Sequence, residues 1–177
     1  MQQKIQFIVT ILHQPELLIF DEPFSGFDPI NVDLIKNEIL KLRDEGASII
    51  FSTHSMESVE QLCDNIALIH QSKVVLSGAV NEIKSRFSQN LFEVESYKAD
   101  LSTITPNLPQ GIHYQKTEPN SSLYKHYFKL DASLAPNDLL ASLLPYMQIT
   151  GFRELLPSMH DIFVSTIQNG SLPANPS

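Results

Sequence analysis

The chain has 177 residues, of which 42% are hydrophobic and 18% charged, as expected for a globular protein of one or two domains. Its 20 acidic and 12 basic residues give a formal net charge of −8, which argues against a nucleic-acid-binding protein because such proteins usually present a basic face. A single cysteine excludes an intrachain disulfide, and no apolar run approaches the roughly 18 residues of a membrane-spanning helix.

The first half of the chain predicts helices that alternate with strands. Helical spacing of apolar residues predicts a helix over residues 2–13. Residues 16–20, which are apolar from Leu17 on, predict a strand buried on both faces, because the apolar residues do not alternate with polar ones. The later elements are a helix over 31–45, a strand over 47–53, a helix over 56–64 that Ser55 could cap, and strands over 65–70 and 73–78. This order is typical of an α/β layer with a largely parallel sheet.

After Gly78 the pattern changes to that of a small α+β domain, with a boundary near residues 79–90. The predicted elements are a helix over 79–87, strands over 91–96 and 124–130, a helix over 137–144, a strand over 147–155 and a helix over 158–167. Residues 105–122 are rich in turn formers, and we read them as a connection. Residues 169–177 predict a disordered tail.

The stretch LLIFDEPFSGFDP, Leu17 to Pro29, carries the clearest chemical signal. Its apolar strand ends in two adjacent carboxylates, Asp21 and Glu22. One such carboxylate can hold Mg²⁺, while its neighbour can accept a proton from a water that attacks a phosphate. An Asp-Glu pair alone is more often a solvated turn, but His54 follows a second strand and would project from the same sheet edge.

Together with residues 49–78, this stretch resembles the second half of an ABC-transporter ATP-binding subunit. The strand that ends in Asp-Glu is similar to the family's Walker B motif. The Ser-Gly-Phe-Asp-Pro turn is similar to its D-loop, and the Thr-His segment to its histidine switch. The three motifs occur in the family's order, so the resemblance implies the C-terminal part of a P-loop NTPase parallel sheet, with a small α+β domain after it.

The resemblance implies a role for each matching residue. Asp21 would position Mg²⁺, Glu22 would be the general base, and His54 would contact the terminal phosphate of ATP and the attacking water. The D-loop residues would bind at the interface between two ATP-binding subunits and link their ATP sites; they are Ser25, Gly26 and Asp28.

The resemblance also implies cofactors, partners and a location. The cofactors would be ATP and Mg²⁺. The partners would be transmembrane permease subunits and a second ATP-binding subunit, in a homodimer or a heterodimer, with no nucleic acid. The protein would be peripheral, at the cytoplasmic face of the cell membrane.

Residues 154–167, ELLPSMHDIFVSTI, resemble the closing segment of a small C-terminal domain found on some of these subunits. We therefore expect a partial ABC ATP-binding domain over residues 1–85, an α+β accessory domain over 86–168 and the tail over 169–177. In such proteins the accessory domain looks regulatory or structural, which is a hypothesis here.

The 177 residues contain no G-x-x-x-x-G-K-[S/T] phosphate loop. In the family this loop and the signature motif precede Walker B, and MQQKIQF at the start of the chain resembles the helix just after the signature. We expect a C-terminal portion whose front half was lost by truncation, was missed by a misassigned start or is carried by a separate chain. Because the loop supplies most phosphate contacts, we expect this polypeptide alone to bind ATP weakly or not at all.

Three functions are compatible with these observations. The leading prediction is a subunit that couples ATP hydrolysis to transmembrane transport. The alternative is a non-catalytic regulatory or interaction fragment of such an ATPase. An ABC-type ATPase that acts on DNA ends is disfavoured, because those proteins carry long heptad segments and this acidic chain shows none.

Overall fold

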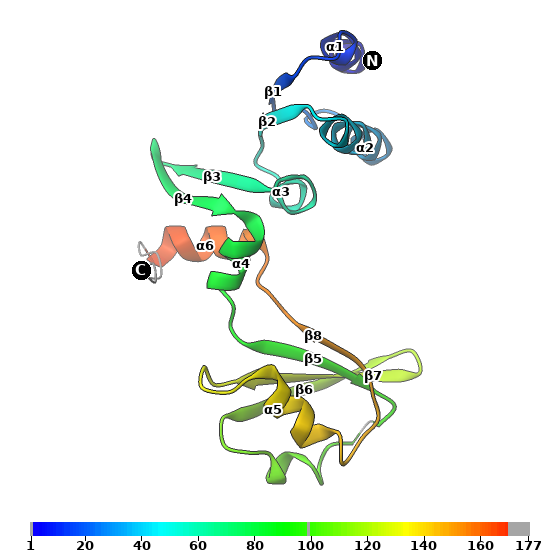
Figure 1. The fold of residues 1–177 in the computed structure, drawn as a ribbon, viewed down its shortest axis with the longest axis vertical. Helices are drawn as coiled ribbons and strands as arrows, with labels where there is room; N and C mark the ends of the chain where they lie inside the picture. Colours follow the sequence, from blue (N-terminus) through cyan, green and yellow to red (C-terminus); the bar gives the residue numbers. More distant parts are fainter. Residues whose placement is uncertain (1, 99, 170–177) are drawn as a thin grey trace. The chain divides into compact units, whose positions relative to one another are not determined.

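The computed structural model describes residues 2–98 and 100–169 (Figure 1). These residues form two compact units that divide between Ile66 and Ala67, inside strand β3. The predicted tail lies outside the described residues except for Asn169, which ends the last helix.

The first unit alternates helices and strands in the predicted order. Its elements are α1 (Gln2–Ile11), β1 (Leu17–Asp21), α2 (Pro29–Asp44), β2 (Ser48–Ser52) and α3 (Met56–Leu62). Strands β1 and β2 pair in parallel, with Leu18 beside Ile49 and Asp21 beside Ser52. The predicted parallel pairing is therefore confirmed for these two strands.

Strand β1 buries only one of its faces. Leu18 is 1% exposed, and Phe20 stacks on Phe7 of α1 with ring centroids 5.4 Å apart. On the other face, Leu17 and Ile19 are 52% and 68% exposed. The prediction that this strand is buried on both faces is wrong for the described chain, because side chains alternate along a strand and only one face is packed here.

Helix α1 also exposes apolar side chains. Ile5, Ile8 and Leu12, which share the helical stripe that predicted this helix, are 58%, 54% and 75% exposed. The predicted helix is therefore present, but the described residues of its own unit do not bury its apolar stripe. Exposed apolar surface of this kind usually marks a site of contact with further protein.

Helix α2 begins two residues earlier than the sequence predicted. Pro29 occupies its first turn, where a missing N–H costs no hydrogen bond. Gly46 follows the helix with φ +105°, a left-handed conformation that side chains rarely adopt. Helix α3 is capped by Ser55, whose hydroxyl accepts from the Ser58 N–H, so the predicted cap is confirmed.

The second unit contains two separate sheets. Its elements are β3 (Asn65–His70), β4 (Lys73–Ala79), α4 (Val80–Arg86), β5 (Leu91–Ser96), η1 (Thr105–Asn107), β6 (Ile112–Asn120), β7 (Leu123–Leu130), α5 (Pro136–Leu143), β8 (Ile149–Glu154) and α6 (Met159–Asn169). Strands β3 and β4 pair with each other, and the residues that join them, Gln71 and Ser72, have φ of 47° and 59°. Two successive positive φ values are typical of a tight hairpin turn.

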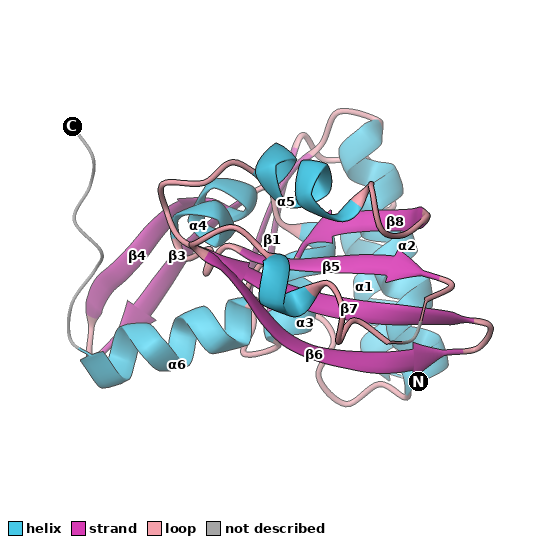
Figure 2. Ribbon diagram, turned by 90° about the horizontal axis from the view of Figure 1, so that it is seen from below, coloured by secondary structure: helices cyan, strands magenta, loops and turns pink. Residues whose placement is uncertain are grey.

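The larger sheet has the order β6-β7-β5-β8, and all its pairings are antiparallel (Figure 2). The sequence prediction was wrong for residues 105–122, which it assigned to a connection, because Ile112–Asn120 among them form strand β6. This strand lies at the sheet edge, where a proline such as Pro119 and many polar residues are tolerated, because an edge strand has a hydrogen-bonding neighbour on one side only.

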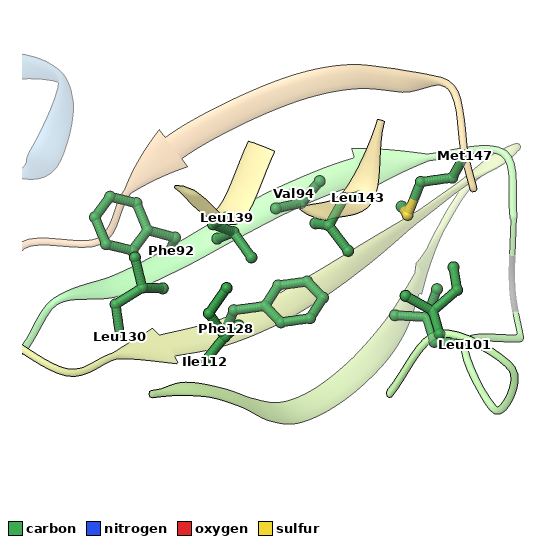
Figure 3. Close-up of a cluster of buried hydrophobic side chains, with 10 residues drawn as sticks. Phe92, Val94, Leu101, Ile112, Phe128, Leu130, Leu139, Leu143 and Met147 are labelled. Carbon is green, nitrogen blue, oxygen red and sulfur yellow. The ribbon is translucent and has the colours of Figure 1, made fainter. Parts of the chain in front are cut away.

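Helix α5 covers one face of this sheet and builds the core of the second unit. Leu139 and Leu143 of α5 are fully buried against Phe92, Val94 and Phe128 of the sheet (Figure 3). The predicted fold class, an α/β part followed by a small α+β part, is confirmed.

The face of this sheet opposite to α5 carries an ionic network around Glu93. Its carboxylate is 3.4 Å from Lys125 Nζ and 2.8 Å from Arg153 Nη2, although the residue is only 3% exposed. Burial opposes ionisation, but hydrogen bonds from Arg153, Tyr127 and Lys125 outweigh it and hold the pKa of Glu93 below its usual value. The network therefore joins β5, β7 and β8 through charge.

A fully buried histidine ties three strands of the same sheet together. His126 Nε2 lies 2.9 Å from Ser96 Oγ, and its Nδ1 lies 2.7 Å from Thr117 Oγ1. Both ring nitrogens thus have hydroxyl partners, which suits the neutral ring because one nitrogen donates and the other accepts. Burial lowers the pKa of His126 from its usual value of 6.5.

This burial predicts acid sensitivity of the second unit. Because the pKa of His126 is lower in the folded state than in the unfolded state, its contribution to stability is complete above about pH 6.5 and is lost as the pH falls through the folded pKa. We expect the free energy of unfolding to fall as the pH drops below about 6.5 toward the folded pKa, and this fall to be absent in His126→Asn. Urea unfolding followed by tyrosine fluorescence measures it, since all five tyrosines lie in this unit and the chain has no tryptophan.

The matched control is His113→Gln, which alters the exposed β6 histidine that pairs with Asp131 at 3.1 Å. This variant should keep the pH dependence of the natural sequence. A fall in stability that disappears in His113→Gln and persists in His126→Asn would show that the buried ring is not responsible.

Candidate functional site

Three of the predicted site residues meet at the carboxyl-terminal end of the β1–β2 pair. Asp21 ends β1, Glu22 follows it directly, and His54 lies two residues beyond the end of β2. His54 Nδ1 is 2.9 Å from Glu22 Oε1, and the side chains of His54 and Glu22 are 85% and 36% exposed. The parallel register thus brings residues more than thirty positions apart to one open sheet edge.

Ser52 connects both acids to β2. Its hydroxyl donates to Asp21 Oδ1, while the Glu22 N–H donates to Ser52 Oγ at 3.1 Å and to Ser52 O at 3.2 Å. Sequence reasoning missed this residue. The signal was present, because parallel pairing of the two predicted strands would put the last residue of the second beside Asp21.

The backbone of Glu22 adopts a left-handed conformation, with φ of 46°. Such a conformation costs a residue with a side chain about 1–2 kcal/mol. The Ser25 N–H donates to Glu22 O at 3.1 Å and closes a turn that begins at the acid. The catalytic candidate therefore occupies a strained position that its hydrogen bonds hold in place.

The loop after the acids is anchored by Phe24. Its ring meets Phe51 of β2 edge to face, with centroids 5.7 Å apart, and Lys36 Nζ of α2 lies 5.7 Å from its centroid. Ser25 and Gly26 remain exposed on this loop, and Gly26 has φ of 76°. Both residues are thus accessible on the surface of the described unit.

Asp28 does not join the acid cluster but begins α2. Its carboxylate accepts from the Asn31 backbone N–H at 3.2 Å and from the Asn31 side-chain amide. The backbone bond is the largest cause that lowers the pKa of Asp28, followed by the side-chain bond and, more weakly, by the charge of Lys4. In this structure Asp28 acts as a helix cap.

The donor set suits Mg²⁺ held together with a nucleotide. Among the described residues, no group of three or more His, Cys, Asp or Glu side chains could hold a metal alone. Asp21 offers one exposed carboxylate, whose Oδ2 has no hydrogen-bond partner in the part of the chain that the structure describes. Mg²⁺ typically takes one or two carboxylates and completes its shell with waters and substrate phosphates, so Asp21 fits that ion.

Comparison with known proteins defines the class of this protein. A family model described as "ATP-binding protein DrrA1-3-like, C-terminal domain" matches residues 78–167, and a model described as an AAA domain matches residues 1–60. The chain belongs to the DrrA1-3-like ATP-binding proteins, a family of ABC transporter ATP-binding subunits. The resemblance identified from the sequence is therefore confirmed.

Full-length relatives agree with this assignment. The chain is 38% identical over 171 residues to YhaQ, an uncharacterized ABC transporter ATP-binding protein of Bacillus subtilis, covering 94% of this chain and 53% of YhaQ. It is 33% identical over 166 residues to a similarly described protein of Alkalihalophilus pseudofirmus, covering 94% of this chain and 60% of that protein. The chain thus spans little more than half the length of these relatives.

A solved ATP-binding subunit of an ABC transporter is also similar to the chain. The two share 31% identity, with a TM-score of 0.46, over 49% of this chain and 36% of that structure. None of the helices in the described residues is both long and apolar enough to cross a bilayer.

The strained backbone of Glu22 leads to a stability prediction. Asparagine tolerates the left-handed conformation better than glutamate does, so Glu22→Asn should stabilise the first unit by about 1 kcal/mol. Hydrogen exchange of the β1 and β2 amides measures the change. Glu22→Gln, which keeps the length of the side chain and its poor tolerance of positive φ, serves as control and should change exchange little. Equal protection in both variants would contradict the assignment of strain.

Proposed function

We propose that this chain is the part of an ABC transporter ATP-binding subunit that hydrolyses ATP and couples hydrolysis to transmembrane transport. One observation carries this proposal: Asp21, Glu22 and His54 come together at the carboxyl ends of two parallel strands. Membership of the ATP-binding family supports it. Ligands of open α/β sheets bind at such strand ends.

The side chains have distinct proposed tasks. Asp21 holds Mg²⁺, which when bound would neutralise charge on the phosphates. Glu22 accepts a proton from the water that attacks the terminal phosphate, a role for which its exposed carboxylate is accessible. With His54 Nδ1 facing Glu22, Nε2 is the ring nitrogen left for the reaction. It accepts from the attacking water when the ring is neutral and donates to the phosphate when the ring is protonated.

The remaining proposals concern assembly. Ser25, Gly26 and Asp28 take part in contact with a second ATP-binding subunit, in a homodimer or heterodimer, and the exposure of Ser25 and Gly26 supports this role. Permease subunits hold the protein at the cytoplasmic face of the membrane. Residues 1–85 act as the ATP-binding part and residues 86–168 as an accessory domain. The family match over residues 78–167, which is to a C-terminal domain, supports an accessory domain in this part of the chain.

A second candidate is a regulatory fragment that docks on such an ATPase without hydrolysing ATP. The exposed apolar side chains of α1 and β1 give such a fragment a surface for contact. The two candidates differ in whether Glu22 supports turnover once a phosphate loop is supplied.

The first test joins this chain to the part of YhaQ that it does not span. We expect the fusion to hydrolyse ATP and Glu22→Gln to lower kcat by about 100-fold or more, because the general base is removed, while ATP binding remains. Phosphate release and nucleotide binding are measured on both proteins. Glu45→Gln, an exposed acid at the end of α2, should retain full activity. Unchanged hydrolysis in Glu22→Gln would refute the assigned base, and an inactive fusion would favour the regulatory fragment.

The second test uses the 177-residue chain alone. Backbone N–H groups of a phosphate loop normally supply most contacts to ATP, so we expect the affinity for Mg²⁺-ATP to be weaker than micromolar. Isothermal titration calorimetry measures it, with the fusion protein as positive control. Micromolar or tighter binding by the chain alone would mean that other residues hold the phosphates.

A further inference from the structure

We propose that Ser52 is a positioning residue that orients both Asp21 and Glu22 for Mg²⁺-dependent hydrolysis. Its catalytic consequence rests on the function proposed above. The geometry itself rests only on β1, β2 and the two acids. Ser52 is therefore distinct from the three residues that would touch the nucleotide, water or metal.

The hydrogen bonds use both the donor and an acceptor of one hydroxyl group. A serine hydroxyl has one proton to donate and lone pairs with which to accept. Ser52 donates its proton to Asp21 Oδ1 and accepts the Glu22 N–H at 3.1 Å. A single side chain thus holds a carboxylate and the backbone of the next residue in one arrangement.

Each of these bonds has a separate effect. The bond to Oδ1 of Asp21 orients the carboxylate and leaves Oδ2 for a metal ion. The Glu22 N–H has two acceptors, the hydroxyl and the carbonyl of Ser52, and this residue has φ of 46°. Hydrogen bonds of this kind hold a strained residue in a conformation that it would otherwise leave.

Neighbouring hydroxyl groups do not share this role. Thr53 Oγ1 accepts the Ser55 N–H at 3.1 Å and so belongs to the turn that precedes α3. Ser48 stands four residues before Ser52 on the same face of β2 and pairs with Leu17 at the far end of β1. Ser48 therefore offers a matched control: the same residue type, strand and face, away from the acids.

The substitutions Ser52→Thr and Ser52→Val separate the hydroxyl group from the shape of the side chain. Threonine keeps a hydroxyl, whereas valine has nearly the same shape without one, and both residues favour strands. A purely structural role for the side chain predicts that the two variants behave alike. A positioning role predicts that threonine preserves the site and valine does not.

The first measurement uses Mn²⁺ and the 177-residue chain, with no nucleotide. Paramagnetic broadening of the Asp21 and Glu22 amide signals should occur at similar Mn²⁺ concentrations in the natural sequence, Ser52→Thr and Ser48→Ala. Ser52→Val should need about 10-fold more Mn²⁺, in the range found when the partner of a metal ligand is removed. Unchanged amide signals in α5 and β7 would show that the second unit keeps its fold.

The second measurement uses the active fusion described above. Ser52→Val should raise the Mg²⁺ concentration for half-maximal hydrolysis and lower kcat, each by about 10-fold, while metal-free ADP binding is retained. Ser52→Thr should restore both values. Equal Mn²⁺ and Mg²⁺ dependence in the threonine and valine variants would overturn the proposal. If the natural fusion is inactive, the hydrolytic function fails, but the Mn²⁺ comparison still decides whether Ser52 positions the acids.

Discussion

The parallel register of β1 and β2 is the constraint on which the candidate site depends. It sets Asp21 directly beside Ser52, so that one hydroxyl reaches both the carboxylate and the Glu22 N–H. A shift by one residue would turn Ser52 to the opposite face and break both bonds. The same register carries the chain beyond β2 to the point where His54 meets Glu22. The pairing of these two strands therefore places all three groups: the Asp21 carboxylate, the base candidate Glu22 and the His54 imidazole.

The two units bury their apolar residues to different extents. In the second unit, α5 closes one face of the sheet over a core in which Phe128, Leu139 and Leu143 are fully buried. In the first unit, Ile19 of β1 and Leu12 of α1 remain 68% and 75% exposed. The chain spans 53% and 60% of the length of two family relatives. The candidate site and the exposed apolar side chains thus both belong to the first unit.

Local sequence signals predicted the elements that obey strong local rules. The 3.6-residue spacing of Ile35, Ile39 and Leu42 predicted α2, and Ser55 was recognised as the cap of α3. Strand β6 escaped prediction because it is polar, contains Pro119 and owes its extended form to pairing with β7. The exposed face of β1 was also not predicted. An apolar residue in a sequence indicates a tendency to be buried, but the sequence does not show which part of the structure would cover it.

The sequence alone predicted the residues of the candidate site: an apolar strand that ends in Asp21 and Glu22, a Ser-Gly turn, and His54 after a second strand. That prediction rested on the resemblance of these short motifs to the ABC family and on residue types that suit Mg²⁺ and proton transfer. Only the tertiary structure decided that Ser52 bonds both acids, that Glu22 is held at positive φ and that Asp28 caps a helix. Those facts depend on the pairing of distant strands and on backbone dihedral angles, which neighbouring residues in the sequence do not specify.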